Sequence, residues 1–408
     1  MKEKKISPNK IFFLASAIAL LIISITLLIL FVITNRPSLA FYRVPEQVEK
    51  SIYNYIVQNT KKDYKLIELD SSIPLSKQKK LVKNATFLFV NQDCDTKEFA
   101  IKSSIIKSLP LDLCSNLPDS VQNSIPIKNK SVKYLPLLYD FYQIDVDYTL
   151  LQKSPVNKIN CWQDLEDFLY SQKALFKTPL IFDGNDSIAA IDIFGMLLES
   201  FNSPEDYTQI LDKIYQIYKN SNGNLEIFTE NFELFVNSNE ACIKTKDNIQ
   251  RLIQKGIIDK SVLQFQKGSS VSLTENNSSA ALILKLSDHR KINHSVIRNY
   301  KSVYCPSFPE NFKRKFAAPE IALLCCKKSK KNILLAKKLI QSGQTEISTN
   351  GGLSPVDKNS TPSDLQADDV RYWIAASSGP LLPLSCAIPE DKFKEEAAQI
   401  LYKFNYDY

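Results

Sequence analysis

The sequence Ala-Thr-Phe-Leu-Phe-Val at residues 85–90 carries one polar side chain and no charge. Such a run, rich in apolar and β-branched residues, predicts a strand that is buried on both faces. On its N-terminal side, residues 75–83 have the pattern of a short basic helix, residues 64–69 that of a strand and residues 48–56 that of an amphipathic helix. Strands that alternate with helices in this way predict an α/β fold, with a parallel sheet covered by helices on both faces.

The same alternation continues toward the C-terminus. Strands are predicted at residues 180–182 and 321–326, and an amphipathic helix at 390–404. Residues 203–206, Ser-Pro-Glu-Asp, predict a helix start because they supply an N-cap, a proline at the first position and acids in the first turn. Residues 342–361 are rich in Ser, Thr, Asn, Gly and Pro and predict an exposed or hinge-like loop.

The composition argues against several classes of enzyme. The 408 residues include only nine glycines, and none of them falls in a dinucleotide-binding or P-loop motif. A histidine-dependent mechanism or zinc site would need His289 or His294, which are five residues apart with no Cys-x-x-Cys nearby. We therefore expect no catalytic residues, no cofactor and no metal site.

A membrane segment is predicted near the N-terminus. Residues 11–34, which begin at Ile11 and end at Thr34, carry no charge, and 17 of them are Ile, Leu, Phe or Val. A helix of this length spans about 36 Å, enough to cross a hydrocarbon core of about 30 Å. A cleaved signal peptide is the alternative, because residues 38–40 (Ser-Leu-Ala) resemble a cleavage site, although signal sequences have apolar runs of only about 7–15 residues.

The distribution of charge orients this segment. Residues 1–10 contain four lysines, which predict a cytoplasmic tail and place the C-terminal body outside the cytoplasm, periplasmic or extracellular, on a single-pass anchor in the cell membrane. The first 36 residues carry +4 of the net charge of +7. The remaining body is close to neutral, which argues against nucleic-acid binding.

Eight cysteines would lie in this external body, at positions 94, 114, 161, 242, 305, 325, 326 and 386. Eight cysteines allow 105 disulfide connectivities, among which the sequence does not choose. Buried free thiols are the alternative, because a body of this size does not need disulfides for stability.

Several segments carry a family resemblance. Residues 132–140 (VKYLPLLYD) are similar to a "vyalP" passage between two lobes, and residues 159–165 (INCWQDL) to a "pkTWdEL" helix start. Further similarities lie at residues 109–112, 148–151, 255–256, 268–284, 329–340 and 351–355. In this order they resemble the extracellular solute-binding proteins of ABC importers, sugar-binding type, family 1. The resemblance covers roughly residues 37–405.

The resemblance implies a two-lobed, periplasmic-binding-protein-like α/β fold of class II, preceded by the transmembrane helix. Lobe one would comprise residues 37–136 and 319–348, and lobe two residues 139–316 and 351–408. A small polar solute, by resemblance a sugar, would be captured between the lobes and passed to the permease subunits of an ABC transporter. The alternative is a membrane-tethered sensory or interaction module that keeps this fold and no longer serves transport.

Two groups of candidate ligand-binding residues follow predicted strands. Asn91, Gln92 and Asp93 come directly after strand 85–90, where α/β sheets present their ligand-binding loops. Amide and carboxylate groups suit sugar hydroxyls, and helix capping or a solvated turn is the alternative. Asn185 and Asp186 precede a predicted helix whose N-terminal amides could donate to a bound oxygen, and capping is again the alternative.

Four more candidates depend on the resemblance. Tyr139 lies at the passage between the lobes, where its ring would stack on a sugar or be buried in the hinge. Ser287 and Asp288 occupy the loop in which many family members carry an "ngpW" turn. The chain departs from the family in having only two tryptophans, and Trp162 matches a helix start. Trp373 is therefore the candidate for stacking, with packing in the core as its alternative.

Overall fold

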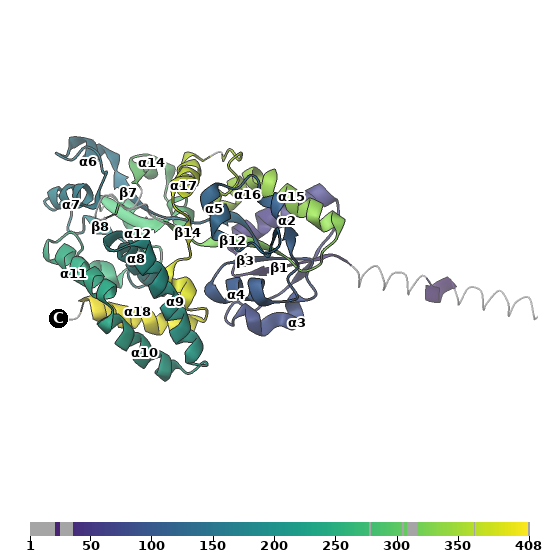
Figure 1. Cartoon of the computed structure of the whole chain (residues 1–408). Helices are drawn as coiled ribbons and strands as arrows, with labels where there is room; N and C mark the ends of the chain where they lie inside the picture. Colours follow the sequence, from purple (N-terminus) through teal and green to yellow (C-terminus); the bar gives the residue numbers. More distant parts are fainter. Residues whose placement is uncertain are drawn as a thin grey trace, which may run out of the picture.

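The computed structural model describes residues 21–24, 36–276, 279–303, 306–307, 316–362 and 364–406. The described residues form two α/β lobes that lie side by side (Figure 1). Each lobe has its own sheet and its own apolar core, so the expectation of a two-lobed α/β fold is confirmed.

The first lobe is built on a six-stranded sheet of order β13-β6-β12-β3-β1-β2. Its strands are β1 (Ser38–Tyr42), β2 (Lys65–Ile67), β3 (Phe87–Asn91), β6 (Leu135–Tyr139), β12 (Glu320–Cys325) and β13 (Ser354–Pro355). Strand β1 pairs in parallel with β2 and β3, whereas β12 runs antiparallel to β3 and β6. The sheet is mixed and not wholly parallel as expected, because β6 carries the chain out to the second lobe and β12 carries it back.

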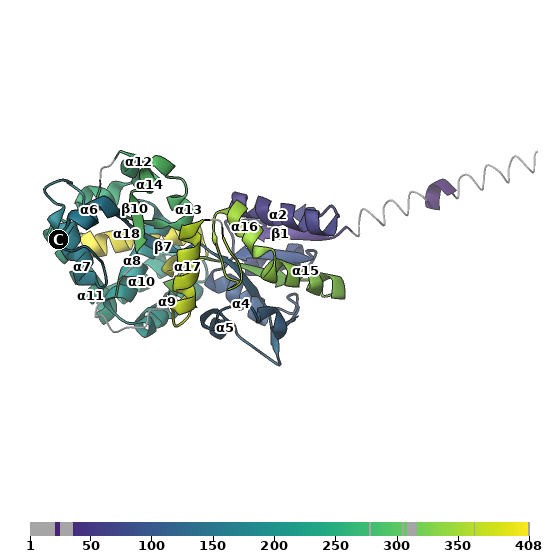
Figure 2. The same ribbon diagram turned by 90° about the horizontal axis from the view of Figure 1, so that it is seen from above.

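Helices cover this sheet on both sides (Figures 1 and 2). They are α2 (Glu46–Thr60), α3 (Lys79–Val82), α4 (Cys94–Lys102), α5 (Asp119–Ser124), α15 (Lys330–Gln341), α16 (Gln344–Gly351) and α17 (Leu365–Ala376), with the 3-10 turns η1 (Leu75–Gln78) and η2 (Leu111–Cys114). A two-stranded ribbon, β4 (Leu109–Pro110) with β5 (Ser131–Val132), lies beside them.

The second lobe has a smaller sheet of order β10-β7-β9-β8. Its strands are β7 (Tyr142–Asp147), β8 (Leu180–Ile181), β9 (Ala281–Lys285) and β10 (Tyr300–Val303). Its helices are α6 (Tyr148–Lys153), α7 (Trp162–Ser171), α8 (Ser187–Phe201), α9 (Pro204–Asn220), α10 (Leu225–Ser238), α11 (Glu240–Gln254), α12 (Ser269–Glu275), α13 (Leu286–His289), α14 (His294–Ile297) and α18 (Asp391–Tyr406), with η3 (Lys260–Gln264) and η4 (Leu384–Ala387). Helix α9 starts with the predicted Ser203 cap and Pro204.

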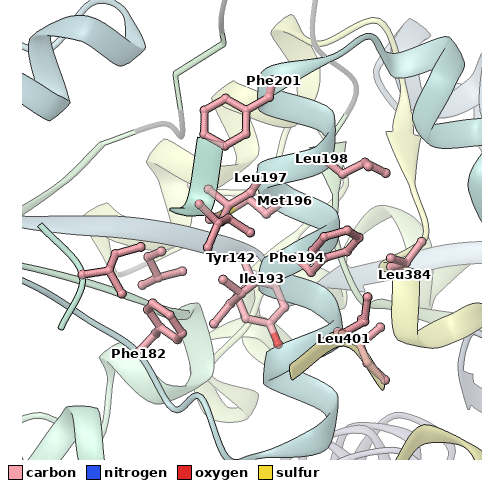
Figure 3. Packing of buried hydrophobic residues seen from close by; sticks show 14 of the residues in the cluster. Tyr142, Phe182, Ile193, Phe194, Met196, Leu197, Leu198, Phe201, Leu384 and Leu401 are labelled. Atoms are coloured by element: carbon pink, nitrogen blue, oxygen red, sulfur yellow. The ribbon is translucent and has the colours of Figure 1, made fainter. Parts of the chain in front are cut away.

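Helix α8 forms the centre of the second lobe. All of its residues from 191 to 201 are buried, and it packs against α18, α11, α9 and η4. Figure 3 shows its apolar side chains, among them Phe194 and Phe201, surrounded by Tyr142, Phe182, Leu384 and Leu401. This packing also fixes the position of Asp192, a buried acidic residue of the same helix.

The segment at 342–361 differs from the expected exposed or hinge-like loop. It forms α16 and the edge strand β13, which pairs with β6 in the first-lobe sheet. Buried Gln344 explains the difference, because its side-chain oxygen accepts hydrogen bonds from the backbone nitrogens of Val356 and Asp357 at 2.6 and 2.7 Å. Helix α17 also packs in the first-lobe core, although the predicted boundaries place residues 351–408 in lobe two.

The chain passes between the lobes in more than one place. Tyr139 and Phe141 belong to the first core and Tyr142 to the second, so the first crossing lies at residues 139–142. Farther along, β11 (Phe316–Ala317) pairs in parallel with β14 (Pro380–Leu381), which follows α17 between the lobes (Figure 1).

Within the described residues, we find no helix both long enough and apolar enough to traverse a membrane. The predicted span at residues 11–34 lies outside the described residues except for 21–24, which are helical. Seven of the eight cysteines are described, and no disulfide joins any two of them.

Candidate functional site

A cavity of about 280 Å³ lies between the two lobes. Its first-lobe wall lies at the ends of β1 and β3, in the loop after β2 and just before β12, and is formed by Arg43, Ser71, Asn91, Gln92, Asp93 and Pro319. Its second-lobe wall includes Ile188 and Asp192 from α8, Lys285 from the end of β9, Ser385 and Cys386 from η4, and Asp391 and Lys394 from α18. The ends of strands from both sheets therefore face one space, which is where open α/β sheets bind ligands.

Arg43 directly follows β1 and is held in place from two sides. Its Nε donates to the backbone oxygen of Ser71 at 2.8 Å, and its Nη1 donates to Asp93 Oδ2 at 2.9 Å. Its φ of 57° lies in the left-handed region, which is uncommon for a residue other than glycine and is frequent at functional sites. The remaining nitrogen, Nη2, is buried and has no hydrogen-bond partner within the described part of the chain.

The residues after β3 combine a helix cap with unsatisfied polar atoms. Asp93 caps α4, because its Oδ1 accepts from the Thr96 backbone nitrogen at 2.7 Å. Gln92 is only 2% exposed, and its Nε2 has no partner among the described residues, as is also true of Asn91 Oδ1. Buried polar atoms are nearly always hydrogen-bonded in native proteins, so orphaned atoms at a cavity wall indicate a place for a polar ligand or water.

Glu320, at the start of β12, adds a fourth buried polar atom without a described partner beside the cavity. Its backbone oxygen accepts from the Gln92 backbone nitrogen at 2.8 Å, and its Oε2 accepts from the Tyr139 hydroxyl at 2.8 Å. Its other carboxyl oxygen is buried without a partner among the described residues. Burial raises the pKa of Glu320, against a smaller opposing effect of Lys97.

Asp192 and Lys285 present opposite charges from the second lobe. Asp192 Oδ1 accepts from the Ser385 backbone nitrogen at 2.9 Å, and Oδ2 accepts from the Tyr142 hydroxyl at 3.1 Å. Lys285 Nζ lies 5.1 Å from the centroid of the Tyr142 ring. Burial by itself would lower the pKa of Lys285, but the carboxylates of Asp192 and Asp140 raise it overall, so the side chain is a cation at neutral pH.

The acidic groups at the cavity have raised pKa values because they are buried. Burial raises the pKa of Asp93 to about 6, and the neighbouring Arg43 guanidinium opposes this shift. Burial also raises the pKa of Asp192, opposed by Lys285 and by the hydrogen bonds from Ser385 and Tyr142. These carboxylates are stabilised by neighbouring donors, but less well than they would be by water.

The other candidates from the sequence lie outside this cavity wall. Tyr139 is fully buried and donates to Glu320, and Trp373 packs edge-on against Phe141 with ring centroids 5.8 Å apart. Ser287 donates from its backbone nitrogen and its hydroxyl to Asp140, at 3.0 and 2.7 Å. Asp288 pairs with Lys291 at 2.6 Å.

Asn185 and Asp186 line a different hollow. This groove of about 710 Å³ lies within the second lobe, between the start of α8, η3 and α18. Asp186 caps α8, with its Oδ1 accepting from the Ala189 backbone nitrogen at 2.8 Å. Asn185 is exposed at the groove wall.

The sequence reasoning missed three of the residues that shape the cavity: Arg43, Asp192 and Lys285. Each had a recognisable signal, because each is a lone charge at the end of, or within, an otherwise apolar segment: LAFYR, SIAAID and ALILK. Charges in buried segments need a partner and often mark a functional site.

The chemistry of the described residues offers no sign of a metal centre or of aromatic stacking. No group of three or more His, Cys, Asp or Glu side chains is arranged to hold a metal in the described part of the chain. Among the described residues that line the inter-lobe cavity, none is aromatic. The cavity is suited to hydrogen bonding and to charge pairing with a small polar molecule.

The lobes also touch each other around the cavity. Glu98 on α4 of the first lobe accepts from Tyr215 Oη at 2.7 Å and pairs with Lys219 at 3.0 Å, both on α9 of the second lobe. Lys77 pairs with Glu390 at 3.3 Å, and the Cys386 thiol donates to the Gln92 backbone oxygen at 3.3 Å. These contacts hold the lobes against each other on the α4 and α9 side.

Solved structures of solute receptors share this two-lobed fold. AcbH, described as a bacterial solute receptor with an exclusive preference for β-D-galactopyranose, matches with a TM-score of 0.67 at 10% identity, over 90% of this chain and 97% of its own. A chitin oligosaccharide binding protein matches with a TM-score of 0.61 at 14% identity, over 91% and 93% of the two chains. RafE in complex with raffinose also matches with a TM-score of 0.61, at 12% identity and over 90% and 98%.

At these identities the comparisons establish a shared fold, and the predicted resemblance to sugar-binding solute receptors is confirmed at that level. No protein-family model matches the sequence, and no curated protein matches it either.

Proposed function

We propose that this chain is an extracytoplasmic solute-binding receptor that captures one small polar ligand, a sugar, between its lobes for ABC-type import. The observation that carries the proposal is the set of buried, unpartnered polar atoms on the first-lobe wall: Arg43 Nη2, Asn91 Oδ1 and Gln92 Nε2. They face charged residues of the second lobe across a shared cavity. A ligand that bonds to both walls would favour the closed arrangement of the lobes.

The size of the cavity supports a small ligand. Small-molecule sites usually measure about 300–1,000 Å³, and this cavity lies just below that range at about 280 Å³. It suits one sugar ring better than an oligosaccharide chain.

A thermal-shift screen of the full-length chain tests the proposal. Monosaccharides, oligosaccharides, amino acids and polyamines would be compared, followed by small-angle scattering with each stabilising compound. We expect a monosaccharide to raise the melting temperature and to make the protein more compact, because only the folded, closed form binds it. A screen in which no carbohydrate stabilises the protein would exclude a sugar receptor.

We further propose that residues 11–34 anchor the receptor in the membrane with its body outside the cytoplasm. The support is the uncharged run of 24 residues and the four lysines that precede it. Membrane fractionation followed by protease treatment of intact cells tests the topology: the body should be found with membranes and should be cleaved from outside. Recovery of a shortened, soluble body would instead indicate a cleaved signal peptide.

A further inference from the structure

The acidic groups that line the inter-lobe cavity already have hydrogen-bond donors within the protein. Asp93 accepts from Thr96 on one oxygen and from Arg43 on the other, at 2.7 and 2.9 Å. Asp192 is likewise bonded on both oxygens, by Ser385 and Tyr142. The carboxylate oxygens of Asp93 and Asp192 therefore leave little capacity to accept from a ligand.

Hydrogen-bond donors are left over on both walls, beside two acceptors of the first lobe that lack a described partner, Asn91 Oδ1 and Glu320 Oε1. Arg43 Nη2 and Gln92 Nε2 are buried without a partner among the described residues. Lys285 Nζ forms no hydrogen bond or ion pair with any described residue and lies over the face of the Tyr142 ring. Two of these three donors are cations, and they approach the cavity from different lobes.

We propose that the ligand carries a carboxylate, and that Arg43, Gln92 and Lys285 bind it as an acidic monosaccharide of the hexuronate type. This inference rests on the proposed function, since it names the class of sugar that the receptor captures. A carboxylate supplies acceptors to all three donors, and bonds between ionised partners are shorter and stronger than neutral ones. A neutral sugar offers hydroxyl groups alone and leaves the guanidinium and ammonium groups less well satisfied.

Three cations and three carboxylates line the cavity, and the pairing among them leaves Lys285 available to a ligand. Of the acidic residues, Asp93 pairs with Arg43 and Asp391 pairs with Lys394, at 2.9 Å each. Lys285 has no carboxylate within ion-pair distance in the described structure, although Asp192 and Asp140 raise its pKa from farther away. The absence of aromatic residues among the described lining also favours a site based on charge pairing over one based on ring stacking.

Isothermal titration of the full-length chain tests the inference. The compounds are glucuronate and galacturonate, their neutral counterparts glucose and galactose, and the non-sugar carboxylates succinate and glutamate. We expect each hexuronate to bind at least about tenfold more tightly than the matching hexose.

Two variants address the donors directly. Gln92→Glu replaces a buried donor by a negative charge of about the same size, which would repel a carboxylate, and Lys285→Met removes the ammonium. Each should weaken hexuronate binding at least about tenfold and remove its advantage over the matching hexose measured on the same variant. Lys267→Met is the matched control, because Lys267 is exposed in the second-lobe groove and away from the cavity. Should one variant fail to fold, the other and the comparison of ligands on the native chain still decide the question.

The outcomes separate this inference from the proposed function. If hexoses bound as tightly as hexuronates, the ligand would not need a carboxylate, but the proposal of a sugar receptor would still hold. If succinate or glutamate bound and no sugar did, a ligand carboxylate would be supported, but the assignment of the ligand as a hexuronate would be wrong. Failure of every compound to bind would overturn both.

Discussion

Tyr215 donates its hydroxyl hydrogen to Glu98 across the interface between the lobes, with 2.7 Å between the two oxygens. Glu98 belongs to α4 of the first lobe and Tyr215 to α9 of the second, and Lys219 of α9 joins the same carboxylate at 3.0 Å. Burial alone would raise the pKa of Glu98, but the bonds from Lys102, Tyr215 and Lys219 lower it to about 2. Glu98 is therefore a carboxylate at neutral pH and joins the two lobes in the arrangement that this structure shows.

Replacing Glu98 by alanine should favour an open arrangement of the lobes. We expect a larger radius of gyration by small-angle scattering and a ligand affinity weaker by about two- to fivefold, the range of a partly exposed ion pair. Lys102→Ala is the matched control: Lys102 also pairs with Glu98, at 2.5 Å, but lies on the same helix and spans no interface. An equal expansion in both variants would contradict a role for Glu98 between the lobes.

The free energy of unfolding should depend on pH through the protonation of Asp93. Its pKa of about 6 in the folded protein lies above its ordinary value of 3.8, so folding favours the protonated form. Asp93 thus contributes a stabilisation that is fully present below pH 3.8 and is lost as the pH rises through 6; in total it amounts to about 1–3 kcal/mol.

Urea unfolding of the native chain and of Asp93→Asn at pH 5.0 and 7.5 measures this contribution. The asparagine keeps the oxygen that caps α4 but does not titrate. The native chain should gain more stability on acidification than the variant does. Identical pH dependence in the two proteins would show that Asp93 does not titrate as inferred.

Much of the fold could be predicted because burial on both faces leaves a clear pattern in the sequence. The apolar runs at 85–90 and 321–326 became the neighbouring central strands β3 and β12. The same reasoning placed Asn91, Gln92 and Asp93 at the end of β3, and they line the inter-lobe cavity.

The opposite wall of the cavity could not be predicted in this way. Asp192 lies at the cavity because the whole of α8 packs into the core of the second lobe. Its partners Tyr142 and Ser385 are 50 and 193 residues away in the sequence. Lys285 reaches the cavity because β9 pairs with β7 in a register that sets it beside Tyr142. Both positions depend on tertiary packing, which local periodicity does not contain.

Phe201 at the end of α8 should be a strong determinant of the stability of the second lobe. Its side chain is fully buried and packs edge-on against Trp162 with ring centroids 4.9 Å apart (Figure 3 shows its place on the helix). Phe201→Ala should lower the free energy of unfolding by about 3–5 kcal/mol, measured by chemical denaturation. Leu234→Ala, at a side chain that is 68% exposed on α10, should change it by less than about 0.5 kcal/mol.

The hydroxyl of Tyr142 should stabilise the folded protein by donating to the charged carboxylate of Asp192. In Tyr142→Phe, Asp192 loses the donor on its Oδ2, so a buried carboxylate keeps one hydrogen bond in place of two. We expect a loss of about 1–3 kcal/mol in the free energy of unfolding at pH 7.5. The pKa of Asp192, already raised by burial, should rise further, so the loss should be smaller at pH 5.0, where more of the carboxyl group is protonated.

Tyr300→Phe provides the matched control for this prediction. Tyr300 is a buried tyrosine on the neighbouring strand β10, and its hydroxyl donates at 3.1 Å to a neutral acceptor, the backbone oxygen of Ser279. Because that acceptor does not titrate between pH 5.0 and 7.5, the cost of removing its donor should be the same at both values. If the two variants showed the same dependence on pH, the hydroxyl of Tyr142 would be acting through packing or a neutral bond, and not through the charge of Asp192.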